Sequence, residues 1–383
     1  MAGIYIHIPF CKSRCRYCDF FSTTQLERRE DYAHAIIAEF IDRQPELNEP
    51  IRTIYFGGGT PSQMPVESLR QILACLEDAA KPLRFSGRSQ SELQGTTLQA
   101  KGDEIGDIEI TLEANPGDIT LEMAQAWRAM GFNRLSIGIQ SFDDDLLRLI
   151  GRRHTAEQAI NAVSIAQQAG FSNISIDLMY ALPTQTMEQW QKDVQTALSL
   201  GIQHISTYGL IYEEGTALTK LLMDNRLQPV DEELEMRMYD YLVEQVCANG
   251  FLHYEVSNFA LPERHSRHNS SYWKDTPYLG LGAAAHSYDG QCRQWNISDL
   301  DGYIQQALAH DLRPEVELLS EEDRLTERVM LSLRTSQGVL KSDIDMHKAK
   351  PYLEQGLLED KGDRVSATTR GFHILNRIIE DLV

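Results

Sequence analysis

The stretch YIHIPFCKSRCRYCDFFS, residues 5–22, decides the fold and the chemistry expected of this chain. It opens with an apolar, β-prone run and continues into a short loop that carries Cys11, Cys15 and Cys18 in a Cys-x3-Cys-x2-Cys spacing. Cysteine thiolates normally hold every iron of a 4Fe-4S cluster, so three of them on one loop leave one iron without a cysteine. The spacing therefore predicts a cluster with one iron open to a small-molecule ligand.

The same three thiols have two other interpretations, a zinc site and a set of unrelated free cysteines. A zinc finger usually adds a second pair of Cys or His ligands about a dozen residues further on. Residues 19–33 contain neither residue type. The cluster is therefore favoured, and zinc and free thiols remain the alternatives.

Short β-rich runs alternate with amphipathic helical stretches up to about residue 215. This alternation is typical of βα units and a parallel sheet. Capping boxes at Thr155 and Thr186 mark the start of two helices. Four helices are expected to end at Gly131, Gly170, Gly201 and Gly250. The expected strands cover residues 4–7, 53–56, 109–113, 134–139, 173–179 and 204–210.

Residues that could bind a ligand or take part in a reaction follow most of these strands. Cys11 follows the first, the glycine-rich residues 57–60 follow the second, Glu113 ends the third and Gln140 follows the fourth, while Asp177 lies within the fifth. In a barrel of parallel strands these positions meet at one mouth, so we expect a single site there. Taken alone, the glycines also fit a plain tight turn, and Glu113 also fits a solvated carboxylate at a strand end.

The composition limits the function classes. The chain has 383 residues, enough to bury roughly three quarters of its unfolded surface in one large and one small domain. Its 36 basic and 56 acidic side chains give a net charge of -20, which disfavours unspecific binding to nucleic acid or an anionic membrane. No signal peptide or spanning helix is visible, because apolar runs such as residues 174–183 are short and interrupted. We therefore expect a cytoplasmic protein without stable membrane insertion or disulfides.

A second cluster of side chains lies towards the C-terminus. Four of the 11 histidines fall in one stretch with large aromatic residues. Imidazole is a common axial ligand of haem iron, and aromatic rings cover a porphyrin face. The alternative is a packed aromatic corner with hydrogen-bonded histidines. The residues are His253, His265, His268, Tyr272, Trp273, Tyr278 and His286.

These motifs together resemble the radical S-adenosylmethionine (SAM) superfamily, and within it the oxygen-independent coproporphyrinogen III oxidase family, above all its HemW-type haem chaperones. The resemblance implies an α/β fold, a radical SAM partial (β/α)6 barrel with an open side cleft and a small winged-helix-like C-terminal domain. It spans nearly the whole chain. The matching stretches are YIHIPFC, YFGGGTPS, RLSIGIQSF, IDLMYALPTQT, HNSSYW and GLGAAAHSY.

The expected organisation has three parts and one insertion. Residues 1–235 would form the barrel with the 4Fe-4S and SAM sites, residues 236–319 a family-specific extension with the haem-associated HNSSYW motif, and residues 320–383 the winged-helix-like domain. Residues 84–107 are rich in Ser, Gln, Gly and Thr, which predicts a mobile surface loop. Winged helices often bind DNA, but the many acidic residues of this one favour protein contacts.

The resemblance also implies ligand-binding roles for single residues. Arg152 would pair with a SAM carboxylate as a planar fork, and no residue is assigned a catalytic role. The residues expected at the cluster-bound SAM are Tyr5, Gly58, Gly59, Thr60 and Glu113. Those expected at a second SAM are Tyr17, Gly59, Thr60, Gln140, Arg152 and Asp177. Haem is expected at His268, Tyr272 and Trp273.

Two departures separate this chain from the oxidases. They carry a further cysteine two residues after the triad, where Phe20 stands here, and an N-terminal extension, whereas Cys11 here lies close to Met1. We therefore expect a haem chaperone with a 4Fe-4S cluster, SAM and an electron donor. It would pass haem to an acceptor protein, for which respiratory proteins are candidates. The alternatives are a coproporphyrinogen III oxidase, which decarboxylates propionates by radical chemistry, and an RNA-modifying radical SAM enzyme, which the acidic composition disfavours.

Overall fold

The computed structural model describes residues 2–47, 49–84 and 108–383. The predicted loop at residues 84–107 lies outside this part of the chain except for its first residue, which ends helix α2 (Val66–Arg84). None of the helices in the described ranges is both long and apolar enough to cross a membrane.

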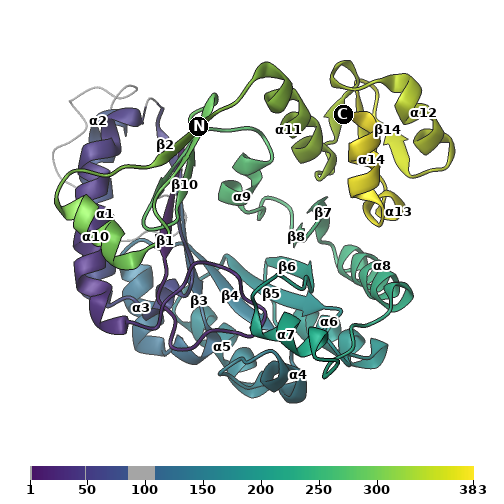
Figure 1. The fold of residues 1–383 in the computed structure, drawn as a ribbon. Helices are drawn as coiled ribbons and strands as arrows, with labels where there is room; N and C mark the ends of the chain where they lie inside the picture. The colour runs from purple at the N-terminus through teal and green to yellow at the C-terminus, as the bar shows by residue number, and fades with distance from the viewer. Residues whose placement is uncertain (1, 48, 85–107) are drawn as a thin grey trace.

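The six predicted strands are confirmed as neighbours in one parallel sheet, in chain order. They are β1 (Ala2–Ile8), β2 (Ile51–Gly58), β3 (Glu109–Ala114), β4 (Arg134–Gln140), β5 (Ile174–Tyr180) and β6 (His204–Gly209). The sheet curves like a barrel wall, with helices on its convex side (Figure 1). Besides α2, the helices between these strands are α1 (Arg29–Arg43), α3 (Leu121–Ala129), α4 (Asp144–Leu149), α5 (Ala156–Gln168) and α6 (Met187–Ser199).

Local sequence signals explain where several of these elements begin and end. Thr155 and Thr186 both form complete capping boxes, so α5 and α6 start where predicted. The four glycines predicted to end helices all have positive φ, a conformation that costs glycine little. β4 is almost entirely buried, as expected for a strand covered on both faces.

The sheet is larger than the six strands predicted from the sequence. Twelve strands pair in the described residues, because the chain after α8 (Glu232–Ala248) adds short strands to both ends. β9 (Tyr278–Leu281) pairs in parallel with β1 and continues into antiparallel β10 (His286–Tyr288), β11 (Cys292–Trp295) and β12 (Glu315–Leu318). At the other end, β8 (Asn258–Ala260) and β7 (Leu252–Glu255) extend β6.

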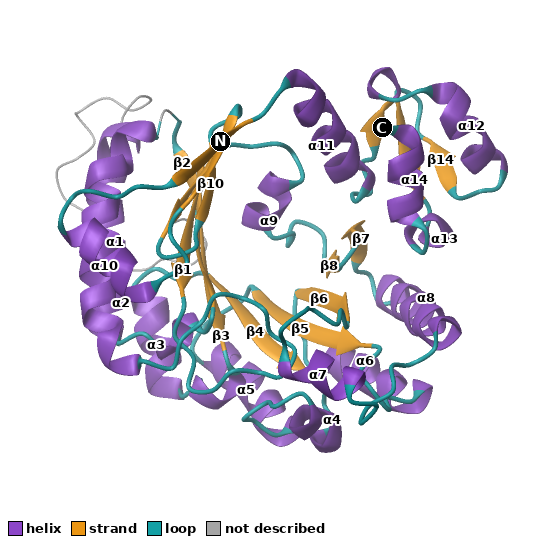
Figure 2. Cartoon of the chain, in the orientation of Figure 1, coloured by secondary structure: helices purple, strands orange, loops and turns teal. Residues whose placement is uncertain are grey.

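The remaining helices cover the ends and the interior of this arc. α9 (Arg267–Tyr272) lies on its concave side (Figure 2). α10 (Leu300–Leu308) packs on α1, and α7 (Ala217–Met223) precedes α8, which itself crosses the predicted boundary at residue 235. Short 3-10 helices cover Leu26–Arg28, Gln44–Glu46, Pro61–Gln63, Pro116–Asp118 and Lys341–Asp343.

The C-terminal part has its own hydrophobic core, separate from the core of the barrel. Its strands are β13 (Val339–Leu340), β14 (Leu358–Asp360) and β15 (Arg364–Ala367), in the order β13-β15-β14. Its helices are α11 (Glu321–Leu333), α12 (Met346–Glu354), α13 (Thr369–Phe372) and α14 (Leu375–Leu382). Backbone hydrogen bonds join this unit to β7, from Val256 N to Arg334 O (2.8 Å) and from Ser336 N to Tyr254 O (3.0 Å).

A buried carboxylate fastens the added strands to the barrel. Glu39 on α1 is fully buried and accepts four hydrogen bonds, so both of its oxygens are satisfied. The donors are Arg43 (3.0 Å), the Gly282 amide (2.8 Å), Asn296 (2.7 Å) and Tyr303 (2.7 Å). Because these donors come from α1, the end of β9, the segment after β11 and α10, one side chain links four separate segments.

We expect Glu39→Ala to lower the free energy of unfolding by about 3–5 kcal/mol, because three buried donors lose their acceptor and Arg43 loses the buried one of its two carboxylate partners. Glu46→Ala is the matched control. Glu46 accepts from the same guanidinium but is 45% exposed, so its loss should cost about 1 kcal/mol or less. Urea unfolding of both variants measures the difference, and equal losses would contradict the role given to Glu39.

Candidate functional site

A cavity of about 420 Å³ opens at the carboxyl ends of the parallel strands. Eleven of the fifteen predicted site residues line it, although they come from segments far apart in the chain. They are Cys11, Cys15, Tyr17, Cys18, Gly58, Gly59, Thr60, Glu113, Gln140, Arg152 and Asp177. Tyr5, His268, Tyr272 and Trp273 lie elsewhere.

The cysteine loop is closed at its base by the end of β1. Cys11 N donates to Thr23 O (2.8 Å) and Thr23 N donates to Pro9 O (2.7 Å). The Nε2–H of His7 donates to the Phe21 carbonyl (2.9 Å), which leaves Nδ1 to bond with the Tyr5 hydroxyl (3.1 Å). The register of β1 therefore fixes where the loop leaves the sheet and where it returns.

The three thiols face the same cavity and interact with its other residues. Cys11 Sγ is hydrogen-bonded to Thr60 Oγ1 (3.4 Å), and Arg152 Nη1 donates to Cys15 Sγ (3.4 Å). Burial raises the pKa of the Cys11 thiol, and burial also raises the pKa of Cys18 to about 11. Within the described residues, no three His, Cys, Asp or Glu side chains converge closely enough to hold one metal ion. All three cysteines line one cavity, and thiolates are the ligand type that a 4Fe-4S cluster takes.

Glycine is required where the end of β2 approaches the end of β1. Gly59 N donates to Ile8 O (2.9 Å), and a Cβ on Gly59 would lie 2.7 Å from the Pro9 carbonyl. Gly58 has φ 108°, and a Cβ there would lie 2.6 Å from the His7 ring. A side chain at either position would push the two strand ends apart. The glycine-rich segment thus shapes the cavity wall next to the cysteine loop.

Two buried carboxyl groups form the floor of the cavity. Glu113 accepts from the Tyr55 hydroxyl (2.6 Å) and the Gly58 amide (3.2 Å), and burial raises its pKa to about 7. Asp177 accepts from Ser136 (3.3 Å), and burial raises its pKa to about 6. A buried group with such a pKa gains from a cation placed beside it, so this floor suits a positively charged ligand.

Arg152 and Gln140 line the cavity next to Gly138. Arg152 is held by the carbonyl of Gly138 as well as by Cys15, so its guanidinium is positioned before any ligand arrives. Gln140 has φ 74°, and the register of β4 against β5 shifts between Gly138 and Gln140. A non-glycine residue in this conformation is costly, and such strain gathers at functional sites.

The predictions from sequence missed Asp118. Its carboxylate is almost fully buried beside the cavity and pairs with Lys12 of the cysteine loop (3.0 Å) and with Arg153 (3.2 Å). Although burial opposes it, these two cations hold the pKa of Asp118 below its ordinary value. The sequence indicates a turn after Asn115-Pro116, where Asp118 lies. Sequence spacing does not show which basic side chains would form ion pairs with this carboxylate.

The structure places Tyr5 in a buried aromatic row outside the lining of the cavity. Its ring centroid lies 6.2 Å from that of Tyr55 and 6.4 Å from that of His268. His268 is fully buried, with Nδ1 bonded to Thr53 Oγ1 (2.7 Å) and Nε2 to the Tyr272 hydroxyl (2.8 Å). Burial lowers the pKa of His268 to about 3, so the ring is neutral and both nitrogens are engaged.

The four clustered histidines do not converge on one point. His253 stacks on Phe259 with ring centroids 4.4 Å apart, and His286 is exposed and stacks on Trp295. For His268, the packed and hydrogen-bonded corner is the arrangement observed. Trp273 and His265 instead line a second cavity, beside the C-terminal unit.

Two family models match the chain. That of the Radical SAM superfamily matches residues 5–197, which contain the cysteine loop and β2 to β5. That of the HemN C-terminal domain matches residues 319–374, which lie in the C-terminal unit.

Curated relatives match the chain over nearly its full length. The heme chaperone HemW of Lactococcus lactis is 34% identical, over 98% of this chain and 96% of its own. The heme chaperone HemW of Bacillus subtilis is 35% identical, over 99% of this chain and 98% of its own. Among solved structures, coproporphyrinogen III oxidase (HemN) of Escherichia coli matches with a TM-score of 0.78, over 99% of this chain and 89% of its own. At 22% identity, this last likeness shows the fold alone.

We expect Gly59→Ala to destabilise the protein by about 1–3 kcal/mol, because the new methyl group would overlap the Pro9 carbonyl. Gly117→Ala is the matched control, since the nearest atom to its Cβ would be 3.6 Å away, an ordinary contact. Thermal unfolding of the cofactor-free protein compares the two variants. Equal melting temperatures would contradict the tight contact at Gly59.

Proposed function

Because the chain belongs to the radical SAM superfamily, in the family that includes the HemW heme chaperones, we propose that it is a haem chaperone that binds haem and passes it to an acceptor protein. The observation that carries the proposal is identity of 34% and 35% to two proteins of that name over nearly the entire chain. Matching over both units favours a shared activity more than a shared barrel alone would.

The proposed cofactors are a 4Fe-4S cluster on Cys11, Cys15 and Cys18 and SAM in the cavity beside them. Glu113 and the segment at Gly58 to Thr60 would hold the cationic amino group of SAM, since the buried carboxyl floor favours positive charge. Such a cluster supplies one-electron chemistry to a bound SAM. This chain's residues would orient the ligand and exclude water.

A second SAM molecule is proposed for the part of the same cavity around Arg152. Arg152 is already oriented there and offers a fork to a carboxylate. Gln140, Asp177 and Tyr17 line the same region.

The proposed partners are haem, a haem-acceptor protein, with respiratory proteins as candidates, and an electron donor for the cluster. No disulfide joins two cysteines within the described ranges, which suits a reducing compartment such as the cytoplasm. The net charge of -20 does not favour nucleic acid as a partner.

The competing function is oxygen-independent coproporphyrinogen III oxidation. It is supported by the SAM-type cavity and by the fold shared with HemN. Against it stands Phe20, which occupies the position of the oxidases' further cysteine. Phe20 lines the cavity and is 65% exposed, so this position supplies no thiol for electron transfer.

We expect Cys15→Ala to lose its cluster after anaerobic reconstitution, because two remaining thiolates cannot hold three irons. Cys292→Ala is the control, since Cys292 is half-buried on β11. Iron and sulfide analysis should give about four of each per parent and control chain and close to none for Cys15→Ala. Full cluster content in Cys15→Ala would refute the assignment.

We also expect the reconstituted protein to deliver haem to an apo-acceptor and to form no protoporphyrinogen from coproporphyrinogen III. The haem-loaded chain is mixed anaerobically with an apo-cytochrome, and transfer is followed by absorption after separation of the two proteins. A parallel incubation with SAM, reductant and coproporphyrinogen III is analysed by chromatography. Enzyme-like turnover without haem transfer would make the oxidase correct.

A further inference from the structure

The buried carboxylate of Asp118 joins three segments that surround the cavity of the cysteine loop, although its own side chain does not line that cavity. We infer that Asp118 is a positioning residue for the 4Fe-4S cluster, one that fixes Lys12 and Arg153 beside the thiols and cancels part of their positive charge. This inference rests on the proposed function, because it assumes the cluster. Asp118 would act through its partners and not by contact with the cluster.

Lys12 connects Asp118 to the cysteine loop. The Lys12 ammonium donates to Asp118 Oδ1 (3.0 Å), and Lys12 directly follows Cys11 in the chain. The Asp118 side chain is only 4% exposed, whereas that of Lys12 is 48% exposed. An ion pair with one buried partner is screened less by water and salt than a fully exposed pair. The contact therefore restrains the first part of the loop.

The second connection runs to the segment after the glycine-rich end of β2. Ser62 Oγ donates to Asp118 Oδ2 (3.0 Å), and the side-chain amide of Gln63 donates to the same oxygen. Gln63 N also donates to Thr60 O (2.9 Å), and the Thr60 hydroxyl is bonded to the Cys11 thiol (3.4 Å). Cys11 is therefore linked to Asp118 through the cavity wall as well as along the loop.

The third connection runs to a pair of arginines between α4 and α5. Arg153 Nη2 donates to Asp118 Oδ2 (3.2 Å), and the Arg153 side chain is 26% exposed. The adjacent Arg152 donates to Cys15 Sγ (3.4 Å) and is the residue proposed to meet a SAM carboxylate. Both arginines line the same cavity as the three cysteines. Fixing Arg153 therefore restricts where the guanidinium of Arg152 can lie.

The three charged side chains leave one net positive charge next to the cysteine loop. Burial opposes the ionisation of Asp118, but Lys12 and Arg153 hold its pKa below the ordinary value, so the carboxylate is charged at neutral pH. Neither cation forms an ion pair with any other described residue. The net charge around an iron–sulfur cluster is one of the factors that set its reduction potential. Removing the carboxylate and removing a cation should therefore shift the potential in opposite directions.

The first experiment measures that potential in the full-length chain after anaerobic reconstitution. Asp118→Asn keeps the shape of the side chain and removes its negative charge, so the reduction potential of the cluster should become more positive. Lys12→Gln removes a positive charge, so the potential should become more negative. In the double variant the net charge is restored, and its potential should lie between those of the single variants. Redox titration followed by electron paramagnetic resonance measures all three.

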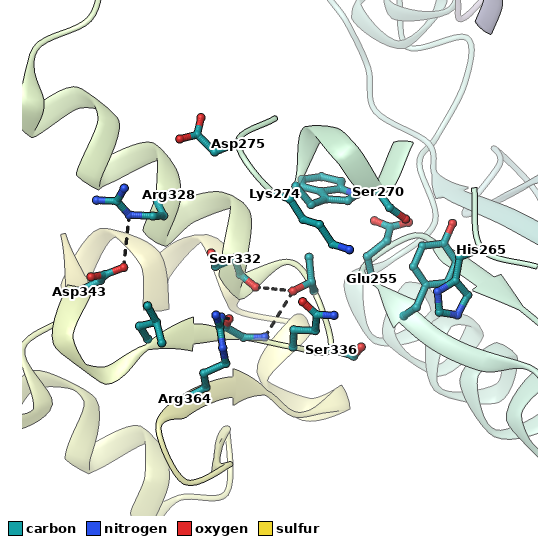
Figure 3. A pocket seen from close by; sticks show the side chains of 16 residues that line it. Glu255, His265, Ser270, Lys274, Asp275, Arg328, Ser332, Ser336, Asp343 and Arg364 are labelled. Carbon is teal, nitrogen blue, oxygen red and sulfur yellow. Dashed lines mark hydrogen bonds and ion pairs between the residues drawn. The ribbon is translucent and has the colours of Figure 1, made fainter. Parts of the chain in front are cut away.

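Asp343→Asn is the matched control. A second cavity, of about 440 Å³, lies between α9, β7 and the C-terminal unit, which contributes Arg328, Asp343 and Arg364 to its wall (Figure 3). Asp343 is half-buried there and pairs with Arg328 (3.3 Å). The control thus removes one carboxylate charge from an ion pair, but no residue of the cysteine loop lines this cavity. The potential of the cluster should stay at the parent value.

The second experiment tests the positioning without any cofactor. In Asp118→Ala the donors at the buried carboxylate lose their acceptor, so local opening of the cysteine loop should become easier. Hydrogen exchange followed by mass spectrometry should be at least about fivefold faster than in the parent for residues 11–23. Peptides from the C-terminal unit should exchange as in the parent, which also shows that the variant is folded.

The outcomes separate this inference from the proposed function. Equal potentials in Asp118→Asn and Lys12→Gln would overturn the charge balance, and unchanged exchange in Asp118→Ala would overturn the positioning, while a cluster in the parent leaves the proposed function intact. A parent without a cluster refutes the proposed function, and the exchange measurement then still decides whether Asp118 holds the loop. If Asp118→Ala does not fold, the potentials of the other variants decide.

Discussion

The position of β1 is the constraint on which the rest of the structure depends. This strand pairs in parallel with β2 on one side and with β9 on the other, so no backbone edge is left to shift. Its last residues carry the base of the cysteine loop and receive Gly59 of the neighbouring strand end. Tyr32 on α1 adds a further bond to the His7 carbonyl (2.8 Å). The thiols are therefore positioned by strand pairing, although they sit on a loop.

Carboxyl groups inside the curved sheet carry a desolvation cost. Glu113 and Asp177 are buried with hydroxyl and amide donors beside them, and a cationic ligand would relieve their remaining penalty. Glu39 is the opposite case, because four hydrogen-bond donors satisfy its carboxylate and it links separate segments of the fold. Glu39 therefore stabilises the fold, whereas Glu113 and Asp177 keep a penalty that a cationic ligand would lower.

The barrel could be predicted from sequence because its signals are local. Strand runs, the capping boxes at Thr155 and Thr186 and the three cysteines each lie within a short window, and parallel topology then brings strand ends together. The strands β7 to β12 escaped prediction because each spans only three or four residues and is stabilised by pairing with distant segments. The different surroundings of His265 and His268 were equally hidden. Three positions apart in sequence, they differ only in their tertiary neighbours, Tyr254 for one and Thr53 with Tyr272 for the other.

The two separate hydrophobic cores have a consequence for how the protein is made. The barrel core is built from residues up to α10, whereas the C-terminal core uses only residues from α11 onward. Domains tend to fold in the order in which the ribosome delivers them. The cysteine loop and its cavity would therefore be complete on the nascent chain before the wall that contains Arg364 has emerged. The cysteine loop can thus fold during translation, while the cavity beside α9 closes last.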